Sequence, residues 1–287
     1  MLKRIYKLII GKLPLSYRIF LQYFRVFRCF PNIKNPMSLN EKILKRILCE
    51  KDPAFAFYSD KYAVREYIAK TLDKKYLIPL IAVYDKSSDL ENLNKWENIV
   101  IKPNHGAGMV EIIDNEPEYN DKIIIMKKAQ KWLELDFSKV CDEWHYSLIK
   151  PKLVVEQKIT DMNESLRDYK FHRFLQKDGT YKQILQVVAE RSNHGYETVF
   201  FDILDLSKIL HSPFDYKLIL SLKEKEAIGH IVELNSKICP EYNYVRLDWY
   251  ITKDQIYFGE ITFTPGAGRS KSFAGKFGLK MGGLWYE

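Results

Sequence analysis

The runs Val245-Arg246-Leu247-Asp248-Trp249-Tyr250 and Ile256-Tyr257-Phe258-Gly259-Glu260-Ile261-Thr262, separated by a short turn, are the most informative part of this chain. Both are rich in β-branched and aromatic residues, which predicts the two strands of a hairpin. Side chains alternate between the faces of a strand, so Arg246 and Asp248 share one face. Cross-strand pairing then brings Asp248 and Glu260 together, and such carboxylates suit Mg²⁺ that holds a nucleotide's phosphates. The alternative is a solvent-facing hairpin with ordinary surface charges.

A second hairpin pattern lies upstream and contains a lysine and two glycines. The apolar run 98–103 predicts a strand with Lys102 near its end, and a glycine-containing loop at 104–109 leads into a further strand at 110–113. A P-loop or a dinucleotide-binding fingerprint would instead open a helix. The pattern favours a flexible lid whose backbone N–H groups fold over phosphates while Lys102 neutralises their charge. A glycine-containing β-turn beside an exposed lysine remains the alternative.

Two more strands are predicted at 151–157 and 168–174, with a polar stretch between them. The first ends beside Glu156, where backbone N–H and C=O groups can meet the edge of an adenine ring. Asp168 begins the second strand and can reach a ribose hydroxyl.

In their order and spacing these patterns resemble the ATP-grasp superfamily, and more closely its TupA-like branch, linked to teichuronopeptide biosynthesis among bacterial polysaccharide genes. The resemblance rests on residues 35–42, 60–65, 101–106, 168–171 and 246–268. It implies an α+β protein with the ATP-grasp fold, in which two α+β units clasp ATP between them.

The resemblance also implies roles for individual residues. The nucleotide-binding residues would be Lys61 and Lys102 on the phosphates, Gly106 and Gly108 in the lid, Glu156 and Gln157 at the adenine hinge, and Asp168 on the ribose. Arg246 would steady the reacting phosphate, and Asp248 and Glu260 would bind Mg²⁺. The third metal position holds Thr262, where the wider superfamily usually has Asn. A hydroxyl is a poorer Mg²⁺ ligand than an amide oxygen, so one or two ions are expected.

Three further residues are site candidates by their place in the chain. Of six dispersed histidines, only His105, in the glycine loop, and His194 lie where a function is expected. We expect Arg191 to contact phosphate or an acyl phosphate and His194 to orient the substrate. For His194, a plain loop residue is the alternative.

Positive charge is concentrated at the N-terminus. Residues 1–40 contain eight Lys or Arg and no acid, and because the whole chain also sums to +8, residues 41–287 are neutral overall. Apolar residues in this segment are spaced for amphipathic helices interrupted at Pro14, but its apolar runs are too short to span a membrane, and it lacks the pattern of a signal peptide. It suits contact with an anionic bilayer or an acidic polymer, unless its apolar face packs on the rest of the protein. No nucleic-acid module is recognisable.

Length and landmarks predict the domain organisation. A chain of 287 residues buries a sizeable core and favours two structural units. We divide it into a basic segment at 1–40, a larger unit formed by 41–95 and 161–287 with the metal site, and a small lid at 96–160. Helices are expected at 60–70, 122–135 and 222–238, and a strand at 77–84. The four scattered cysteines predict buried, reduced thiols rather than a zinc site or disulfides.

The sequence therefore predicts a cytoplasmic ATP- and Mg²⁺-dependent ligase that can associate with the inner face of the membrane. It would activate a carboxylate as an acyl phosphate and join it to an amine. The resemblance implies a uronic acid of a capsule or surface polysaccharide, monomeric, nucleotide-linked or polymeric, coupled to an amino acid or small amine. A glycosyltransferase, or a non-catalytic membrane- or polysaccharide-binding protein with an ATP-grasp shell, are the alternatives.

Overall fold

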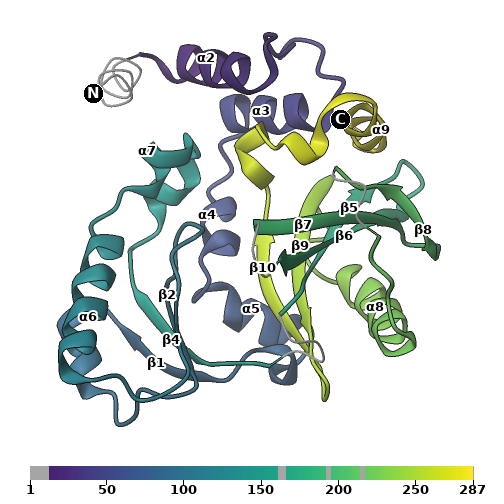
Figure 1. Ribbon diagram of the computed structural model, residues 1–287. Helices are drawn as coiled ribbons and strands as arrows, with labels where there is room; N and C mark the ends of the chain where they lie inside the picture. The colour runs from purple at the N-terminus through teal and green to yellow at the C-terminus, as the bar shows by residue number, and fades with distance from the viewer. Residues whose placement is uncertain (1–12, 161–165, 192–194, 214–216, 287) are drawn as a thin grey trace.

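Two antiparallel β-sheets with helices around them make up the chain (Figure 1). The computed structural model describes residues 13–160, 166–191, 195–213 and 217–286. Helices and strands both contribute substantially, as the predicted α+β class requires.

The smaller sheet has the strand order β1 (Leu80–Tyr84), β4 (Leu153–Gln157), β2 (Ile99–Pro103) and β3 (Glu111–Ile113). Helix α6 (Tyr119–Leu133) covers one of its faces. The core between them contains Ile99, Ile101, Leu153 and Val155 from the sheet and Ile125, Ala129 and Trp132 from the helix. By the period of two, the opposite face carries the residues between these, among them Lys102 and Glu156.

Strand β1 corrects the predicted domain division. Its residues pair with β4, with Val83 opposite Val154, so 80–84 belong to the smaller sheet and not to the larger unit in which we placed 41–95. The strand begins after Pro79, because proline has no N–H to donate to a ladder. The sequence of an apolar strand does not indicate which strand it pairs with, and β4 lies about seventy residues farther along the chain.

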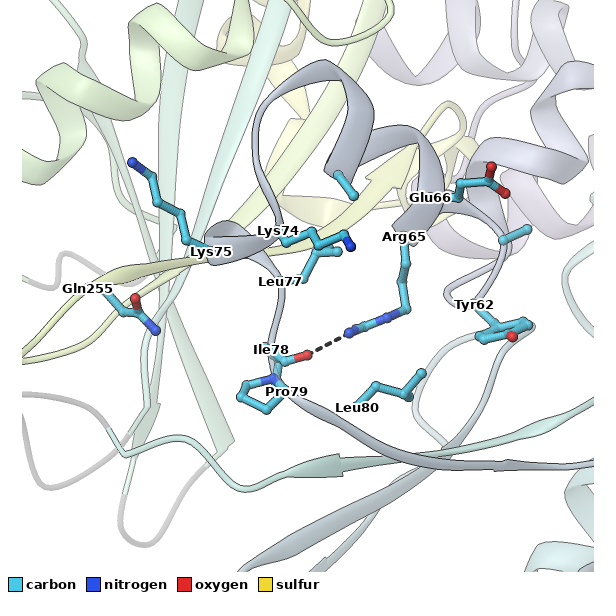
Figure 2. Close-up of a pocket in the computed structure, with 12 residues that line it drawn as sticks. Tyr62, Arg65, Glu66, Lys74, Lys75, Leu77, Ile78, Pro79, Leu80 and Gln255 are labelled. Atoms are coloured by element: carbon cyan, nitrogen blue, oxygen red, sulfur yellow. Dashed lines mark hydrogen bonds between the residues drawn. The ribbon is translucent and has the colours of Figure 1, made fainter.

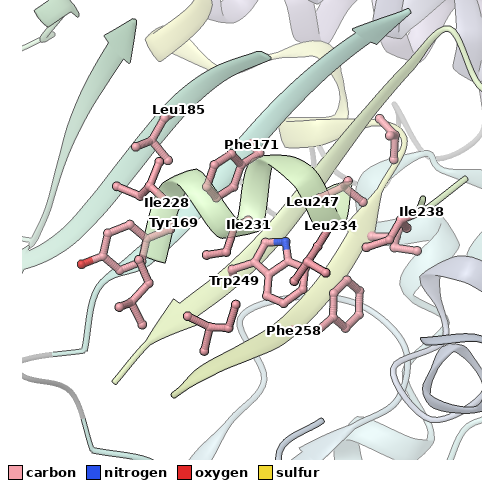
Figure 3. Packing of buried hydrophobic residues seen from close by; sticks show 14 of the residues in the cluster. Tyr169, Phe171, Leu185, Ile228, Ile231, Leu234, Ile238, Leu247, Trp249 and Phe258 are labelled. Carbon is pink, nitrogen blue, oxygen red and sulfur yellow. The ribbon is translucent and has the colours of Figure 1, made fainter. Parts of the chain in front are cut away.

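The larger sheet has six strands in the order β10 (Ile256–Thr262), β9 (Tyr244–Ile251), β5 (Asp168–Leu175), β6 (Tyr181–Arg191), β7 (Gly195–Asp202) and β8 (Asp205–His211). Helix α8 (Leu222–Asn235) packs against one face of this sheet, as Figure 3 shows. Trp249 is fully buried there and donates from Nε1 to Asn235 Oδ1 at 2.9 Å. A capping box formed by Ser221 and Glu224 fixes the start of α8.

The second face of the larger sheet is divided into an apolar end and a charged end. Helices α2 (Leu15–Phe27), α3 (Leu39–Cys49) and α9 (Gly275–Leu284) cover the apolar end. The core there contains Phe174, Phe200 and Tyr244 from the sheet with Ile19, Ile43, Ile47, Phe277 and Met281 from the helices. Farther along β5 and β9, the same alternation places Asp168, Lys170, Arg246 and Asp248 on this face.

Short elements connect these layers. Helices α4 (Ala54–Ser59) and α5 (Val64–Thr71) lie between the two sheets in Figure 1 and add Phe55, Val64 and Ile68 to the core of the larger unit. The others are α7 (Phe137–Cys141) and the 3₁₀ turns η1 (Lys74–Tyr76), η2 (Ser87–Asn92), η3 (Trp144–Leu148), η4 (Pro265–Gly268) and η5 (Lys271–Phe273).

Two sequence expectations meet the structure at the N-terminal side. Helix α2 begins directly after Pro14 and buries Ile19 and Tyr23, so for this helix an apolar face does pack on the protein. Among the described residues, no helix is long and apolar enough to cross a membrane. All four cysteines are free thiols, but Cys29 and Cys49 are exposed, contrary to the predicted burial, because each lies at or just past the end of a helix.

Candidate functional site

Arg246 on β9 is the centre of a charged cluster. Its guanidinium donates from Nε to Asp248 Oδ1 at 2.7 Å and from Nη2 to Asp248 Oδ2 at 2.8 Å. The same Nη2 lies 3.0 Å from Glu260 Oε1 and 3.1 Å from Thr262 Oγ1. Asp248 is buried, and its charge raises the pKa of Arg246 against the opposing effect of burial. The predicted metal-binding residues Asp248, Glu260 and Thr262 therefore converge on one guanidinium nitrogen.

A β-bulge at Gly259 brings Glu260 to this cluster. Phe258 pairs with Trp249 and Glu260 pairs with Asp248, so one residue of β10 is inserted between two consecutive pairs. Without the insertion, Glu260 would pair with Leu247 and point toward α8. A Cβ at Gly259 would lie 3.0 Å from the backbone oxygen of Asp248, which explains the glycine.

Two lysines from other strands and turns complete the cation set. Lys170 on β5 donates to Asp248 Oδ2 at 2.7 Å and lies 3.2 Å from Asp168. Lys61 lies 3.5 Å from Glu260 Oε2. Burial favours neutral Glu260, but the charges of Lys61, Arg246 and Lys170 outweigh it and lower the pKa of Glu260 to about 2. Glu260 is thus an anion at any physiological pH.

Glu156 on β4 carries the charges on the smaller sheet's side. Its buried carboxylate lies 2.7 Å from Arg65 Nη1 and 2.5 Å from Lys102 Nζ. Arg65, on α5, also donates to the backbone oxygen of Ile78 at 2.7 Å (Figure 2). One carboxylate therefore holds two cations, and Arg65 ties α5 to the strand that carries Glu156.

The glycine loop is joined to the segment before α5. Lys61 Nζ donates to the Gly106 oxygen at 2.5 Å, while the Lys61 N–H donates to the Asn104 oxygen at 2.9 Å. Asp60 accepts from Asn104 Nδ2 at 2.9 Å. Gly106 and Gly108 both have positive φ, and a Cβ at Gly108 would meet nothing within 4 Å. At Gly108 the positive φ, rather than lack of room for a side chain, is therefore what favours glycine.

Tyr250 lies on β9, on the same face as Arg246 and Asp248. Burial first, and then the nearby carboxylates of Asp168, Glu260, Asp248 and Glu156, raise the pKa of its hydroxyl well above the usual value. The charges of acidic groups on both sheets therefore act on one phenol. In total the site brings together Lys61, Arg65, Lys102, Lys170 and Arg246 with Glu156, Asp168, Asp248 and Glu260.

Other predicted residues are placed less directly. His105 is buried, with Nδ1 3.4 Å from Asn104 Oδ1 and Nε2 3.2 Å from the Leu135 oxygen, so its ring holds the loop together. Burial lowers its pKa. The N–H of Gln157 donates to the Pro79 oxygen at 3.0 Å. The nucleotide contacts of His105, Glu156, Gln157 and Asp168 remain predictions.

Arg191 and His194 lie at the edge of what the structure describes. Arg191 is the last residue of β6 and pairs with Gly195 through the backbone. His194 lies outside the described residues. Their predicted roles with phosphate and substrate remain predictions.

Sequence reasoning gave no role to Lys170 and Arg65, although both lay within the segments that carried the resemblance. The period of two puts Lys170 on the same face as Asp168, which is a signal for its location. Arg65 follows Lys61 by four residues, but its partner Glu156 is ninety-one residues away, so no local pattern indicates that pair.

An open cavity of about 610 Å³ adjoins the site on the side of α5 and η1 (Figure 2). Arg65, Lys74 and Lys75 give it a basic lining, and Gln255 contributes from the turn between β9 and β10. Asp248 and Glu260 do not line it. Arg65 lines the cavity and also forms the ion pair with Glu156.

Two sheets whose facing sides carry convergent lysines, arginines and carboxylates, with a glycine loop on the smaller one, define an ATP-grasp fold. The chain belongs to the TupA-like ATP-grasp family, which matches residues 41–285. A comparison with curated proteins gives no match.

Several solved structures are similar over most of this chain. D-alanine–D-alanine ligase from Helicobacter pylori has a TM-score of 0.48 and 14% identity, with 80% of this chain and 62% of that chain covered. D-alanine–D-alanine ligase from Bacillus anthracis complexed with ATP has a TM-score of 0.43 and 15% identity, with 80% of this chain and 62% of that chain covered. Phosphoribosylglycinamide synthetase from Anaerococcus prevotii has a TM-score of 0.42 and 15% identity, with 79% of this chain and 50% of that chain covered. The chain spans about three fifths of the first two proteins, and likenesses at this level do not bear on its reaction.

Proposed function

We propose that this protein is an ATP-dependent carboxylate–amine ligase that forms an amide through an acyl phosphate. The observation that carries the proposal is the convergence of Arg246, Asp248 and Glu260, with Lys61 and Lys170 at their edges. Cations of this number suit the phosphates of ATP, and membership of the ATP-grasp family agrees with that use. A protein that only binds sugar has no need for such a set.

The proposed reaction has two steps. A carboxylate oxygen of the substrate attacks the γ-phosphorus, a P–O bond forms, and the bond from the γ-phosphorus to the bridging oxygen breaks as ADP leaves. The amine nitrogen then attacks the acyl carbon; the C–N bond forms, the C–O bond to phosphate breaks, and the nitrogen loses a proton. Arg246 and the lysines neutralise charge that develops on the transferred phosphoryl oxygens, which is the main task of a protein in phosphoryl transfer.

The carboxylates fit a magnesium ion shared with phosphates. Oxygens of Asp248 and Glu260 both lie within 3.0 Å of Arg246 Nη2, so they can also converge on a cation. Among the described residues, no group of three or more His, Cys, Asp or Glu forms a metal cage. Mg²⁺ is typically held by one or two carboxylates plus substrate phosphates, which matches this pair. When bound, Mg²⁺ would neutralise phosphate charge, with Thr262 as the weaker third oxygen.

We further propose a uronic acid of a bacterial surface polysaccharide as the carboxylate and an amino acid or small amine as the acceptor. The support is membership of the TupA-like family, whose resemblance to teichuronopeptide biosynthesis implies a uronic acid carboxyl joined to an amino acid or small amine. Residues 41–287 have no net charge. An acidic substrate would therefore be recognised by individual cations in the site rather than by the electrostatic field of the whole protein.

The test measures ADP release against a panel of uronic acids and amines, with the amide identified by mass spectrometry. We expect ADP formation to require one acid and one amine together. Glu260→Gln should lower turnover by about 100-fold or more, as expected for a group at the reacting phosphates. Glu226→Gln, at an exposed position on α8, is the control and should leave turnover unchanged. Sugar transfer from a nucleotide sugar without ADP release, or normal turnover by Glu260→Gln, would overturn the proposal.

A further inference from the structure

Helix α2 has an outward face that is apolar and aromatic. Its inner face buries Ile19 and Tyr23 against the larger unit. On the opposite side, Tyr17, Leu21 and Phe24 follow one another at spacings of four and three residues, which aligns them along the helix. Their exposed fractions are 64%, 39% and 39%.

The aromatic surface continues beyond the end of the helix. Phe30 is 61% exposed and stacks on Phe24 with ring centroids 4.9 Å apart. We call Tyr17, Leu21, Phe24 and Phe30 the outer face. Between Phe24 and Phe30 the chain turns at Arg28, whose backbone is left-handed and whose side chain is exposed. A cation thus sits within a row of exposed rings.

This surface lies in the most strongly charged part of the chain. Residues 1–40 carry all of the net charge of +8 and contain no acid. Arg25, Arg28 and Lys34 are exposed near the outer face, and the sequence places Lys3, Arg4, Lys7 and Lys12 just before the helix. Exposed rings and aliphatic side chains with surrounding cations are typical of helices that lie in the interface of an anionic bilayer.

Helix α2 is fastened to the body of the protein. Arg18 Nη2 lies 2.7 Å from Asp142 Oδ1, and Gln22 donates to Asp142 Oδ2 at 2.9 Å. Asp142 is buried and follows α7, and Arg269, which lies after η4, reaches it at 3.9 Å. A surface held by these contacts keeps a fixed orientation relative to the rest of the fold.

We infer that the outer face of α2 docks on an anionic membrane surface and holds the enzyme there in one orientation. Two copies of this face would each bring a strongly positive segment, so like-charge repulsion opposes a dimer through it. An acidic polysaccharide satisfies the cations but gives Leu21 and Phe24 no apolar layer to enter. The bilayer interface satisfies both the cations and the apolar side chains.

The test is sedimentation with vesicles of equimolar phosphatidylcholine and phosphatidylglycerol, using the full chain. Wild type should bind at low salt and be released at about 1 M salt, where the Debye length falls to roughly 3 Å. The triple variant Tyr17→Gln, Phe24→Gln and Phe30→Gln keeps every charge and should bind about 10-fold or more weakly. The control is Tyr119→Gln, Leu204→Gln and Leu222→Gln, which removes three apolar side chains elsewhere that are even more exposed, and it should bind like wild type.

Several results would overturn the inference. These are absence of vesicle binding by wild type at low salt, unchanged binding by the triple variant, or binding to soluble polyuronate but not to vesicles. A dimer in sedimentation velocity that the triple variant abolishes would assign the outer face to self-association instead. A matching thermal midpoint for wild type and both variants excludes unfolding as the cause. The readout is binding, so it is independent of whether the proposed ligation is correct.

Discussion

At the scale of single residues, Glu156 shows how one buried carboxylate holds two cations. Lys102 and Arg65 both contact its carboxylate. If Lys102 binds phosphates as predicted, it leaves Glu156, and Arg65 at 2.7 Å then still balances the buried acid. A buried carboxylate left without any partner would cost several kcal/mol, so the second cation makes the exchange feasible.

Lys102→Ala tests this exchange. We expect the affinity for a non-hydrolysable ATP analogue to fall roughly 10- to 100-fold in calorimetry, because a charge-assisted hydrogen bond is lost. Arg65 continues to pair with Glu156, so stability should change little. Lys128→Ala removes an ion-paired lysine from α6 and serves as the control. Equal nucleotide affinity of both variants would make Lys102 an ordinary surface lysine.

At the scale of elements, β10 depends on one irregularity. Its buried side chains are Ile256 and Phe258 on one side of Gly259 and Ile261 on the other, so the apolar alternation shifts by one residue at the glycine. That shift is what lets a strand with a buried face present Glu260 beside Asp248. A regular strand would bury the acid or expose Ile261.

Gly259→Ala should disturb the site more than the fold. The new Cβ would meet the Asp248 oxygen at 3.0 Å and the Tyr250 ring at 3.2 Å, and relief of this contact moves the strand that carries Glu260. We expect a loss of about 1–3 kcal/mol in the free energy of unfolding, and a larger proportional loss of kcat.

The control is Gly229→Ala within α8, where a Cβ meets nothing within 4 Å. It should raise stability by about 0.5–1 kcal/mol, because alanine is the better helix former. Denaturant unfolding and steady-state kinetics on both variants decide the matter. Full activity in Gly259→Ala would show that the bulge does not position Glu260.

The elements also show what the sequence does and does not determine. Alternation and turn residues predicted both hairpins, because local side-chain periodicity follows from which face is buried. The meeting of Asp248 with Glu260 was also predicted, but it depends on the bulge at Gly259, because a regular register would pair Glu260 with Leu247. The pairing of β1 with β4, and of Arg65 with Glu156, depends on tertiary packing between distant segments and leaves no local pattern. Lys170 was within reach of the period-of-two argument but received no role.

At the scale of the whole molecule, buried histidines tie stability to pH, and His172 and His145 have the clearest shifts. His172 lies on the larger sheet, with Nδ1 2.8 Å from the Tyr244 hydroxyl and Nε2 2.9 Å from Gln186 Oε1. Burial lowers its pKa to about 3. His145, in η3, is also buried, and burial and then the charge of Lys51 lower its pKa to about 4. Both rings are therefore neutral in the folded protein at neutral pH.

We predict that the protein loses stability between about pH 6.5 and pH 4. An unfolded histidine has a pKa of about 6.5, so below that pH the unfolded chain binds protons that the folded chain does not. Stability is then complete above pH 6.5 and falls as the pH decreases, by about 2 kcal/mol per histidine at pH 5. The pKa of Glu260 is lowered too, and this group adds its own loss of stability only at lower pH, below its unfolded value of about 4.3. Urea unfolding at pH 7, 6 and 5 measures the effect, and His172→Gln should make the pH dependence shallower, because one buried titrating ring is gone. Equal stability at pH 7 and pH 5 would show that the buried rings take up protons in the folded state.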